Sequence, residues 1–264
     1  MCFENKVILV SGATGGIGGE IVKQLADNNC KLSIFGRKQE ELEKICKNVI
    51  SKGSECIYYK CDSTVKNEVE QGIKSTFEHY GRIDIAILTA GMIEPNPIET
   101  FNSDIIIKTV VVNFFGALYF IEFILPIMIK QKSGVIAAIS TLPDRRGAPG
   151  WGAYGSSKAA LSNVLESLRA EAKQKFNIDV ITIKPGAVET RMTEGYNRPG
   201  KVKVDYAAKL ILNGIKKRKK VIEFPFVQAL PTKLRDMLPP WAYDMFPMDF
   251  LQGDDYPNGT EDKE

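Results

Sequence analysis

Short apolar runs alternate with amphipathic stretches over most of the chain. Val7–Val10 is an apolar run that ends at Ser11-Gly12, a pattern typical of a strand buried on both faces. Comparable runs predict strands at Leu32–Phe35, Cys56–Tyr59, Ile83–Leu88, Val135–Ile139 and Asp179–Ile183. Apolar residues at helical spacing predict helices at Glu20–Asn28, Gln39–Ser51, Val65–Tyr80, Asp104–Lys130, Tyr154–Phe176 and Tyr206–Ile215.

This alternation of strand and helix predicts an α/β fold in which helices cover both faces of a parallel sheet. Right-handed crossovers make such a sheet doubly wound, as in Rossmann-type folds. No internal repeat or linker divides residues 1–248, so we expect one domain there. Residues 249–264 are acidic and polar and are expected to form a flexible tail.

Composition narrows the range of partners. With 264 residues, of which 44% are hydrophobic, the chain can bury a large core. A net charge of +3 is too small to indicate binding to nucleic acid or to an acidic membrane surface. The basic run Lys216–Lys220 is interpreted as a solvated turn after a helix, with an anionic docking patch as the alternative.

The cysteines and the apolar segments indicate the cellular compartment of the protein. Five cysteines without a CxxC pair predict reduced thiols and indicate neither a disulfide framework nor a metal site. Ile105–Ile129 is strongly apolar, but Lys108 and Glu122 interrupt it, so we expect a buried helix rather than a membrane span. With no leader expected ahead of Val7, the chain is predicted to be cytoplasmic.

A glycine-rich turn, Ser11–Gly18, joins the first predicted strand to the first predicted helix. Glycine has no Cβ, so the backbone can approach a phosphate closely, and the helix N-terminus adds free N–H groups and a partial positive charge. A tight structural turn without a ligand is the alternative interpretation. We expect the turn to bind a dinucleotide through Gly12, Thr14, Gly16, Ile17 and Gly18.

The residues after the second predicted strand bear on the choice of cofactor. An acid at this place binds the ribose 2′-OH of NAD, whereas a cation binds the 2′-phosphate of NADP. This chain has Arg37 and Lys38 there and no acid. NADP(H) is therefore favoured over NAD(H), although both cations also suit an exposed helix start.

Tyr154 and Lys158 lie four residues apart on a predicted helix, which places them on one face. A tyrosine with a pKa near ~10 exchanges its proton slowly at neutral pH, and a nearby ammonium is expected to lower that pKa. The pair can then serve as a general acid or base at a carbonyl or alcohol oxygen.

Together with the glycine turn and the order of elements, this pair resembles the short-chain dehydrogenase/reductase family over roughly Lys6–Arg191. The resemblance implies acid–base catalysis by Tyr154, with Lys158 tuning it and holding the nicotinamide ribose. It also implies adenine binding by Asp62 and support of a proton relay by Asn113. Further cofactor contacts implied by the family pattern are Ala90, Gly91, Pro185, Gly186, Val188 and Thr190.

Two positions depart from the family pattern. Leu88-Thr89 stands where the family has two asparagines, which we interpret as a tolerated change in a structural turn. The substrate-orienting serine of the family falls, by spacing from Tyr154, on Thr141. A threonine can donate the same hydrogen bond, but a slip of one residue would make Ser140 the donor.

Substrate choice is expected to lie within residues 191–248, with Arg191–Pro199 as a lid. Residues 224–248 are rich in aromatic and methionine side chains, which suit a pocket for a bulky apolar ketone, the domain's own core or a subunit contact. Asp144–Arg146 either contact an anionic substrate or are ordinary loop residues, and His79 is expected to be structural.

These observations predict an enzyme that reduces a ketone with NADP(H), with Tyr154 as the acid. The alternatives are an NAD-dependent alcohol dehydrogenase of the same family and a catalytically weak dinucleotide-binding sensor or scaffold. The expected partner is a small-molecule carbonyl or alcohol, and family analogy predicts a homodimer or homotetramer.

Overall fold

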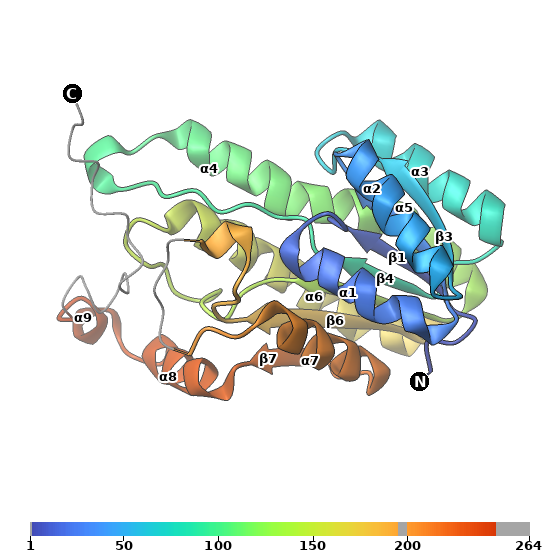
Figure 1. The fold of residues 1–264 in the computed structure, drawn as a ribbon. Coiled ribbons are helices and arrows are strands. Elements are labelled where there is room, and N and C mark those ends of the chain that lie inside the picture. Colours follow the sequence, from blue (N-terminus) through green and yellow to red (C-terminus); the bar gives the residue numbers. More distant parts are fainter. Residues whose placement is uncertain (1, 195–199, 247–264) are drawn as a thin grey trace, which may run out of the picture.

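A computed structural model describes residues 2–194 and 200–246. In this part of the chain seven parallel strands form one sheet in the order β3-β2-β1-β4-β5-β6-β7 (Figure 1). The strands are β1 (Val7–Ser11), β2 (Lys31–Gly36), β3 (Glu55–Lys60), β4 (Ile85–Leu88), β5 (Gly134–Ile139), β6 (Ile178–Pro185) and β7 (Val221–Phe224). The first six confirm the predicted strands, and the seventh was not predicted.

Helices cover both faces of the sheet (Figure 1), which confirms the predicted doubly wound α/β fold. The principal helices are α1 (Gly16–Leu25), α2 (Gln39–Ser51), α3 (Lys66–Tyr80), α4 (Ser103–Val110), α5 (Gly116–Gln131), α6 (Gly152–Phe176), α7 (Val204–Lys216), α8 (Phe226–Asp236) and α9 (Pro240–Tyr243). One face packs against α1, α2 and α7, and the other packs against α3, α5 and α6. The run Lys216–Lys220 spans the end of α7 and the turn into β7.

Strand β1 shows why the strands read as unbroken apolar runs. Ile8 and Val10 belong to the core under α1 and α7, whereas Leu9 between them belongs to the core under α3 and α5. Every residue of β1 is buried, because a parallel sheet with helices on both faces leaves neither side to solvent.

The strand order reverses at β1, which pairs with β2 on one side and with β4 on the other. The connections after these two strands run to opposite faces, so a crevice opens at their carboxyl ends. This crevice is the place where ligands bind in open α/β sheets.

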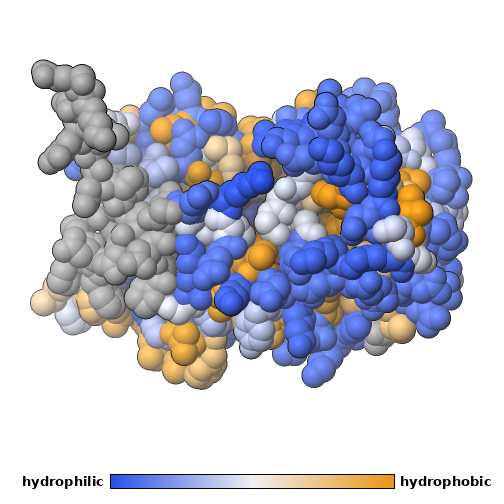
Figure 2. Space-filling view, in the orientation of Figure 1, coloured by the Kyte–Doolittle hydropathy of each residue, from blue (hydrophilic) through white to orange (hydrophobic). Residues whose placement is uncertain are grey.

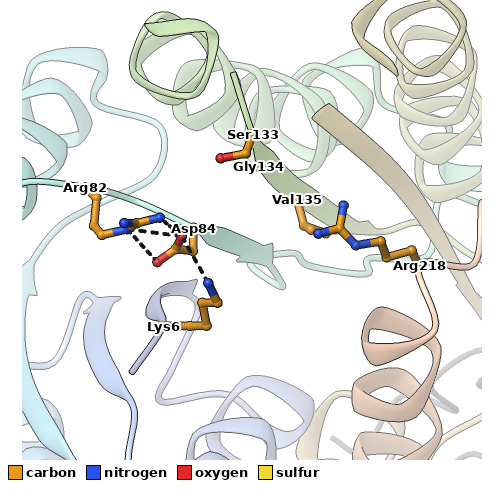
Figure 3. Close-up of a pocket in the computed structure, with 7 residues that line it drawn as sticks. All are labelled: Lys6, Arg82, Asp84, Ser133, Gly134, Val135 and Arg218. Atoms are coloured by element: carbon orange, nitrogen blue, oxygen red, sulfur yellow. Dashed lines mark hydrogen bonds and ion pairs between the residues drawn. The ribbon is translucent and has the colours of Figure 1, made fainter. Parts of the chain in front are cut away.

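At the opposite ends of the strands, the amino ends, ion pairs connect neighbouring residues (Figure 3). Asp84 accepts a hydrogen bond from the backbone N–H of Val7 at 3.0 Å and pairs with Arg82 and Lys6. Ser133 and Arg218 also line the cavity there, which has a volume of about 110 Å³. The Asp84 carboxylate is thus occupied by its neighbours and links the start of β1 to the start of β4. This cavity is therefore not the candidate functional site.

The apolar stretch after β4 forms a continuous helix, Ser103–Gln131, made of α4, a π-helical segment at Val111–Phe115 and α5. Among the described helices it alone is long and apolar enough by composition to cross a membrane. Phe120 and Ile124 pack into the core beneath it, so its inner side forms part of the core of the fold. Only 28% of its most apolar window is buried, because its outer side is open to solvent.

The aromatic and methionine-rich segment divides into two environments. Phe224 and Tyr243 are buried, but most of the large apolar side chains of α8 and α9 are exposed. Orange atoms gather over α8 at the lower left of Figure 2. The exposed members are Phe226, Val227, Leu230, Leu234, Met237, Trp241, Met245 and Phe246. The predicted tail and residues 195–199 of the predicted lid lie outside the described residues.

Candidate active site

A cleft of about 990 Å³ opens at the carboxyl ends of the strands. The side chains and backbone of most residues singled out from the sequence line it. These are Gly12, Thr14, Gly16, Ile17, Gly18, Arg37, Asp62, Ala90, Gly91, Tyr154, Lys158, Pro185, Gly186, Val188 and Thr190. Three others, Lys38, Asn113 and Thr141, do not line the cleft and lie behind or beside it.

The glycine turn is shaped by close packing under the cleft. A Cβ at Gly18 would lie 2.3 Å from the Gly12 carbonyl oxygen, and one at Gly16 would lie 2.6 Å from Thr190 Cγ2. Gly12 also has φ of +69°, which side chains disfavour. Helix α1 begins at Gly16 with no side-chain cap, so its first N–H groups face the cleft as an anion site.

Thr89, where the family pattern has asparagine, ties β4 to this turn. Its hydroxyl donates to the Ser11 carbonyl oxygen at 2.6 Å, and its backbone N–H is bound by the Ser11 hydroxyl at 3.2 Å. The departure from the family pattern therefore preserves a polar link between the ends of β1 and β4.

Two charged side chains stand at the far end of the cleft from Tyr154. Desolvation raises the pKa of Asp62, but hydrogen bonds from Thr64 and the charge of Arg37 outweigh it and lower the pKa overall. Both Asp62 and Arg37 line the cleft. Lys38 instead pairs with Glu41 in the first turn of α2, at 2.7 Å. Only one of the two predicted phosphate-binding cations therefore faces the cleft.

Tyr154 and Lys158 occupy successive turns of α6 at the other end of the cleft. Lys158 is 3% exposed, and its Nζ donates to the Ile139 carbonyl oxygen at 2.7 Å. This nitrogen lies 6.0 Å from the centroid of the Tyr154 ring. Burial lowers the pKa of Lys158 to about 8.

The pKa of Tyr154 is raised, in the direction opposite to that expected from an adjacent ammonium. Desolvation by the surrounding protein is the main cause, and a hydrogen bond with Thr141 partly opposes it. Burial therefore favours the protonated phenol, the form that a proton donor needs before the reaction.

The two candidate hydroxyl donors differ in environment. Thr141 hydrogen-bonds with Tyr154, whereas Ser140 is fully buried. The Ser140 hydroxyl lies within hydrogen-bonding distance of the Lys158 carbonyl oxygen, at 3.2 Å, and of Ser162 Oγ, at 2.7 Å. The Ser140 hydroxyl therefore faces residues of α6, while Thr141 is the hydroxyl that lowers the pKa of Tyr154.

Asn113 lies in the π-helical segment and is fully buried. Its amide nitrogen donates to the Met92 carbonyl oxygen at 2.9 Å and to Ser157 Oγ at 3.0 Å, and its oxygen accepts from the Met92 N–H at 2.7 Å. The wider π turn lets this side chain join the loop after β4 to α6. In the described structure Asn113 positions the backbone beside Gly91 and Lys158.

Asp144 is the polar loop residue whose role the sequence did not reveal. It is buried and forms an ion pair with Lys184 at 2.7 Å, so it is not free to contact an anionic substrate. Arg146 lies over the Tyr243 ring, 4.5 Å from its centroid, and also donates to the Leu238 carbonyl oxygen. His79 packs edge-to-face on Tyr80 near the end of α3.

Several lining residues were not predicted as site residues. Proximity to recognised motifs is the one signal that marks them, since they lie within three residues after Asp62, Gly91 or Gly12, or on α4 and the π-helical segment near Asn113. They include Gly15, Ser63, Thr64, Met92, Lys108, Val111 and Val112. Within the described ranges, no three His, Cys, Asp or Glu side chains gather as metal ligands.

Residues 6–200 match the family model described as short chain dehydrogenase. An uncharacterized oxidoreductase of Listeria monocytogenes is 34% identical over 195 residues, which cover 74% of this chain and 79% of the relative.

Two solved structures share the fold. One is a short-chain dehydrogenase/reductase from Burkholderia phymatum in complex with NAD, with a TM-score of 0.82, 18% identity and coverage of 89% of this chain and 94% of that one. The other is an alcohol dehydrogenase from the archaeon Thermococcus sibiricus with 5-hydroxy-NADP, with a TM-score of 0.75, 24% identity and coverage of 84% and 95%.

Proposed function

The chain belongs to the short-chain dehydrogenase family, and on this premise we propose that it reduces a ketone with NADP(H), using Tyr154 as the general acid. Members of this family are NAD(P)-dependent oxidoreductases, and the fold and cleft of this chain agree with that class. The observation that carries the finer proposal is the placement of Tyr154, which lines the cleft one helical turn from Lys158.

The cleft fits a nicotinamide dinucleotide in shape and in chemistry. The glycine turn leaves no room for a Cβ and presents helix N–H groups, Arg37 is a cation suited to a 2′-phosphate, and no acid follows β2 to repel one. When bound, the nicotinamide supplies a hydride to the carbonyl carbon. The solved neighbours hold NAD in one case and an NADP derivative in the other, so the preference for NADP rests on Arg37.

Three side chains would act on the substrate oxygen. Tyr154 donates its phenolic proton to the oxygen as negative charge develops there, and Thr141 donates a second hydrogen bond. The Lys158 ammonium then stabilises the phenolate that remains. Oxidation of an alcohol uses the same groups in reverse.

Val111 and Val112 of the π-helical segment and Phe120 of α5 line the cleft with apolar side chains, and Met192 adds to them from the segment after Thr190. We propose that they favour a bulky or lipid-like ketone. We also propose that the enzyme is cytoplasmic, because all five cysteines are free thiols, and that it is a homodimer or homotetramer.

The test begins with titration of the purified protein with NADPH and NADH, followed by nucleotide fluorescence. We expect NADPH to bind at least tenfold more tightly, and this preference to disappear in Arg37→Ala because the cation that binds the phosphate is lost. Lys38→Ala is the matched control: this neighbouring lysine pairs with Glu41 and should leave the ratio unchanged. Equal affinities in the wild type would overturn the NADP assignment.

Turnover is then measured against a panel of apolar ketones. Tyr154→Phe removes only the phenolic hydroxyl and should lower kcat at least a hundredfold while NADPH still binds, as expected of a lost general acid. Turnover that survives in this variant would remove Tyr154 from the mechanism. A wild type that binds nucleotide but reduces no ketone would favour a sensor or scaffold.

A further inference from the structure

Asp144 lies three residues beyond Thr141 in the loop after β5, yet its side chain is only 2% exposed. Both carboxylate oxygens face Lys184 on β6, whose Nζ lies 3.0 Å from Oδ1 and 2.7 Å from Oδ2. The Ser162 hydroxyl of α6 donates to Oδ2 at 2.5 Å. A carboxylate held from two other elements in this way fixes the loop that carries it.

The contacts continue from Asp144 to the helix that bears the reacting residues. Ser140 Oγ lies 2.7 Å from Ser162 Oγ and 3.2 Å from the carbonyl oxygen of Lys158. The two serines therefore connect the carboxylate to the helical turn between Lys158 and Ser162. Ser140 is fully buried, so water does not compete for these bonds.

A third segment is held by the same cluster. Lys184 precedes Pro185, which lines the cleft, and the Pro185 carbonyl oxygen accepts from the Leu142 N–H at 3.0 Å. The Asp144 N–H in turn donates to the Leu142 carbonyl oxygen at 3.0 Å. The carboxylate thus stands where the loop after β5, helix α6 and the end of β6 meet.

We propose that Asp144, together with Lys184, is a positioning residue that fixes where the Thr141 hydroxyl and the helical turn at Lys158 lie relative to Tyr154. This inference rests on the proposed function, in which those side chains act on the carbonyl oxygen. Asp144 itself does not line the cleft, so it would act through these neighbours.

Stability alone is a poor explanation for such a pair. The desolvation of two buried charges offsets much of their attraction, so a buried ion pair adds little net stability compared with apolar side chains. What the pair does provide is a defined geometry between β6 and the loop that carries Thr141. The test must therefore separate geometry from folding.

The main experiment compares steady-state ketone reduction in Asp144→Asn, Lys184→Met and Lys184→Arg with the wild type. Asn keeps the size of Asp144 but removes its charge. Because the hydrogen-bond donor at Thr141 would then be misplaced, we expect kcat to fall about 10- to 100-fold. KM and the Kd for NADPH should change less than about threefold. Lys184→Met should lower kcat to a similar extent. Lys184→Arg keeps the cation and should retain most of kcat.

Asp179→Asn is the matched control. Asp179 is also a carboxylate near the end of α6 and on β6, paired with Lys173 at 3.0 Å and with Arg218, but it lies at the opposite end of the strand from Lys184. It should leave kcat unchanged. An Asp144→Asn enzyme with wild-type kcat, or an equal loss in Asp179→Asn, would overturn the proposal.

Hydrogen exchange gives a readout that does not need turnover. In the NADPH-bound proteins, Asp144→Asn should speed exchange of the Leu142 and Asp144 amides at least tenfold, while Asp179→Asn should not. If the wild type reduces no ketone, the proposed function fails, and the exchange rates still decide whether Asp144 positions this loop. Unchanged exchange would show that it does not.

Discussion

Lys158 is buried, although its proposed role requires a positive charge. Its ammonium has one described hydrogen-bond acceptor, the Ile139 carbonyl oxygen at 2.7 Å. Desolvation disfavours the charged form and lowers its pKa to about 8. The residue is therefore held in an environment that disfavours the charge its proposed role requires.

Replacement of Lys158 by methionine should stabilise the cofactor-free protein and abolish turnover. The shift from 10.5 to about 8 corresponds to at most about 3 kcal/mol at neutral pH. Loss of the hydrogen bond to Ile139 returns about 1 kcal/mol, so we expect a net gain of about 1–2 kcal/mol in the free energy of unfolding. Urea denaturation at pH 7 measures it.

The pH dependence of this gain has a definite sign. Between pH 8 and 10.5 the unfolded lysine holds a proton that the folded one has lost, so wild-type stability rises with pH there and the advantage of the methionine variant shrinks. Lys47→Met, at an exposed lysine paired with Glu43, is the control and should change stability by less than about 0.5 kcal/mol. A destabilised Lys158→Met protein would contradict this account.

At the scale of elements, the long apolar and amphipathic stretches were predictable and the irregular ones were not. The predicted Gln39–Ser51 helix matches α2 at both ends, because its apolar spacing is regular. Strand β7 was missed: four residues between a basic run and Pro225 are too short to show a period. The π-helical segment has no sequence signal, and within it Asn113 contacts Met92 and Ser157, which are far away in the sequence.

The site shows the same division. Gly12 and Tyr154 were found because their spacing reflects local geometry within one turn or one helix. The Asp144–Lys184 pair joins residues 40 positions apart, and no local sequence pattern predicts such a pair. Likewise, Lys38 looked equivalent to Arg37 in sequence, and only the structure shows it bound to Glu41.

The glycines of α1 and α6 allow a prediction about elements. Gly18→Ala places a Cβ 2.3 Å from the Gly12 carbonyl oxygen and should displace α1, costing about 1–3 kcal/mol and weakening NADPH binding at least tenfold. Gly155→Ala in α6 meets nothing within 4 Å and should stabilise the helix by about 0.5–1 kcal/mol. Thermal unfolding and nucleotide titration measure both. Equal effects of the two changes would contradict the packing argument.

At the scale of the whole molecule, the outer side of the helix Ser103–Gln131 is a surface that suits a partner. It is apolar, yet Ile107 is 59% and Phe115 is 40% exposed. Exposed apolar surface of this kind on a helix favours association with a second copy, in keeping with the proposed homo-oligomer.

Phe115→Lys should therefore dissociate the oligomer, because it places a charge in the proposed contact. Sedimentation velocity at micromolar concentration should show the wild type as a dimer or tetramer and the variant as a monomer. Phe77→Lys is the control, at an aromatic side chain of α3 that is 41% exposed, and should leave the mass unchanged. A monomeric wild type would overturn the proposal.

The order of strands in the sheet also sets the order in which the protein can assemble during synthesis. Starting from β1, each new strand joins an open edge of the existing sheet: β2 and β3 on one side, then β4, β5, β6 and β7 on the other. No strand has to insert between two that are already paired, so growth by edge addition can follow the ribosome. The glycine turn, Arg37 and Asp62 emerge within the first four strands, whereas Tyr154 emerges only after β5. The phosphate and adenine end of the cleft is thus translated before the reacting residues, whereas the cleft wall at Pro185–Thr190 comes last.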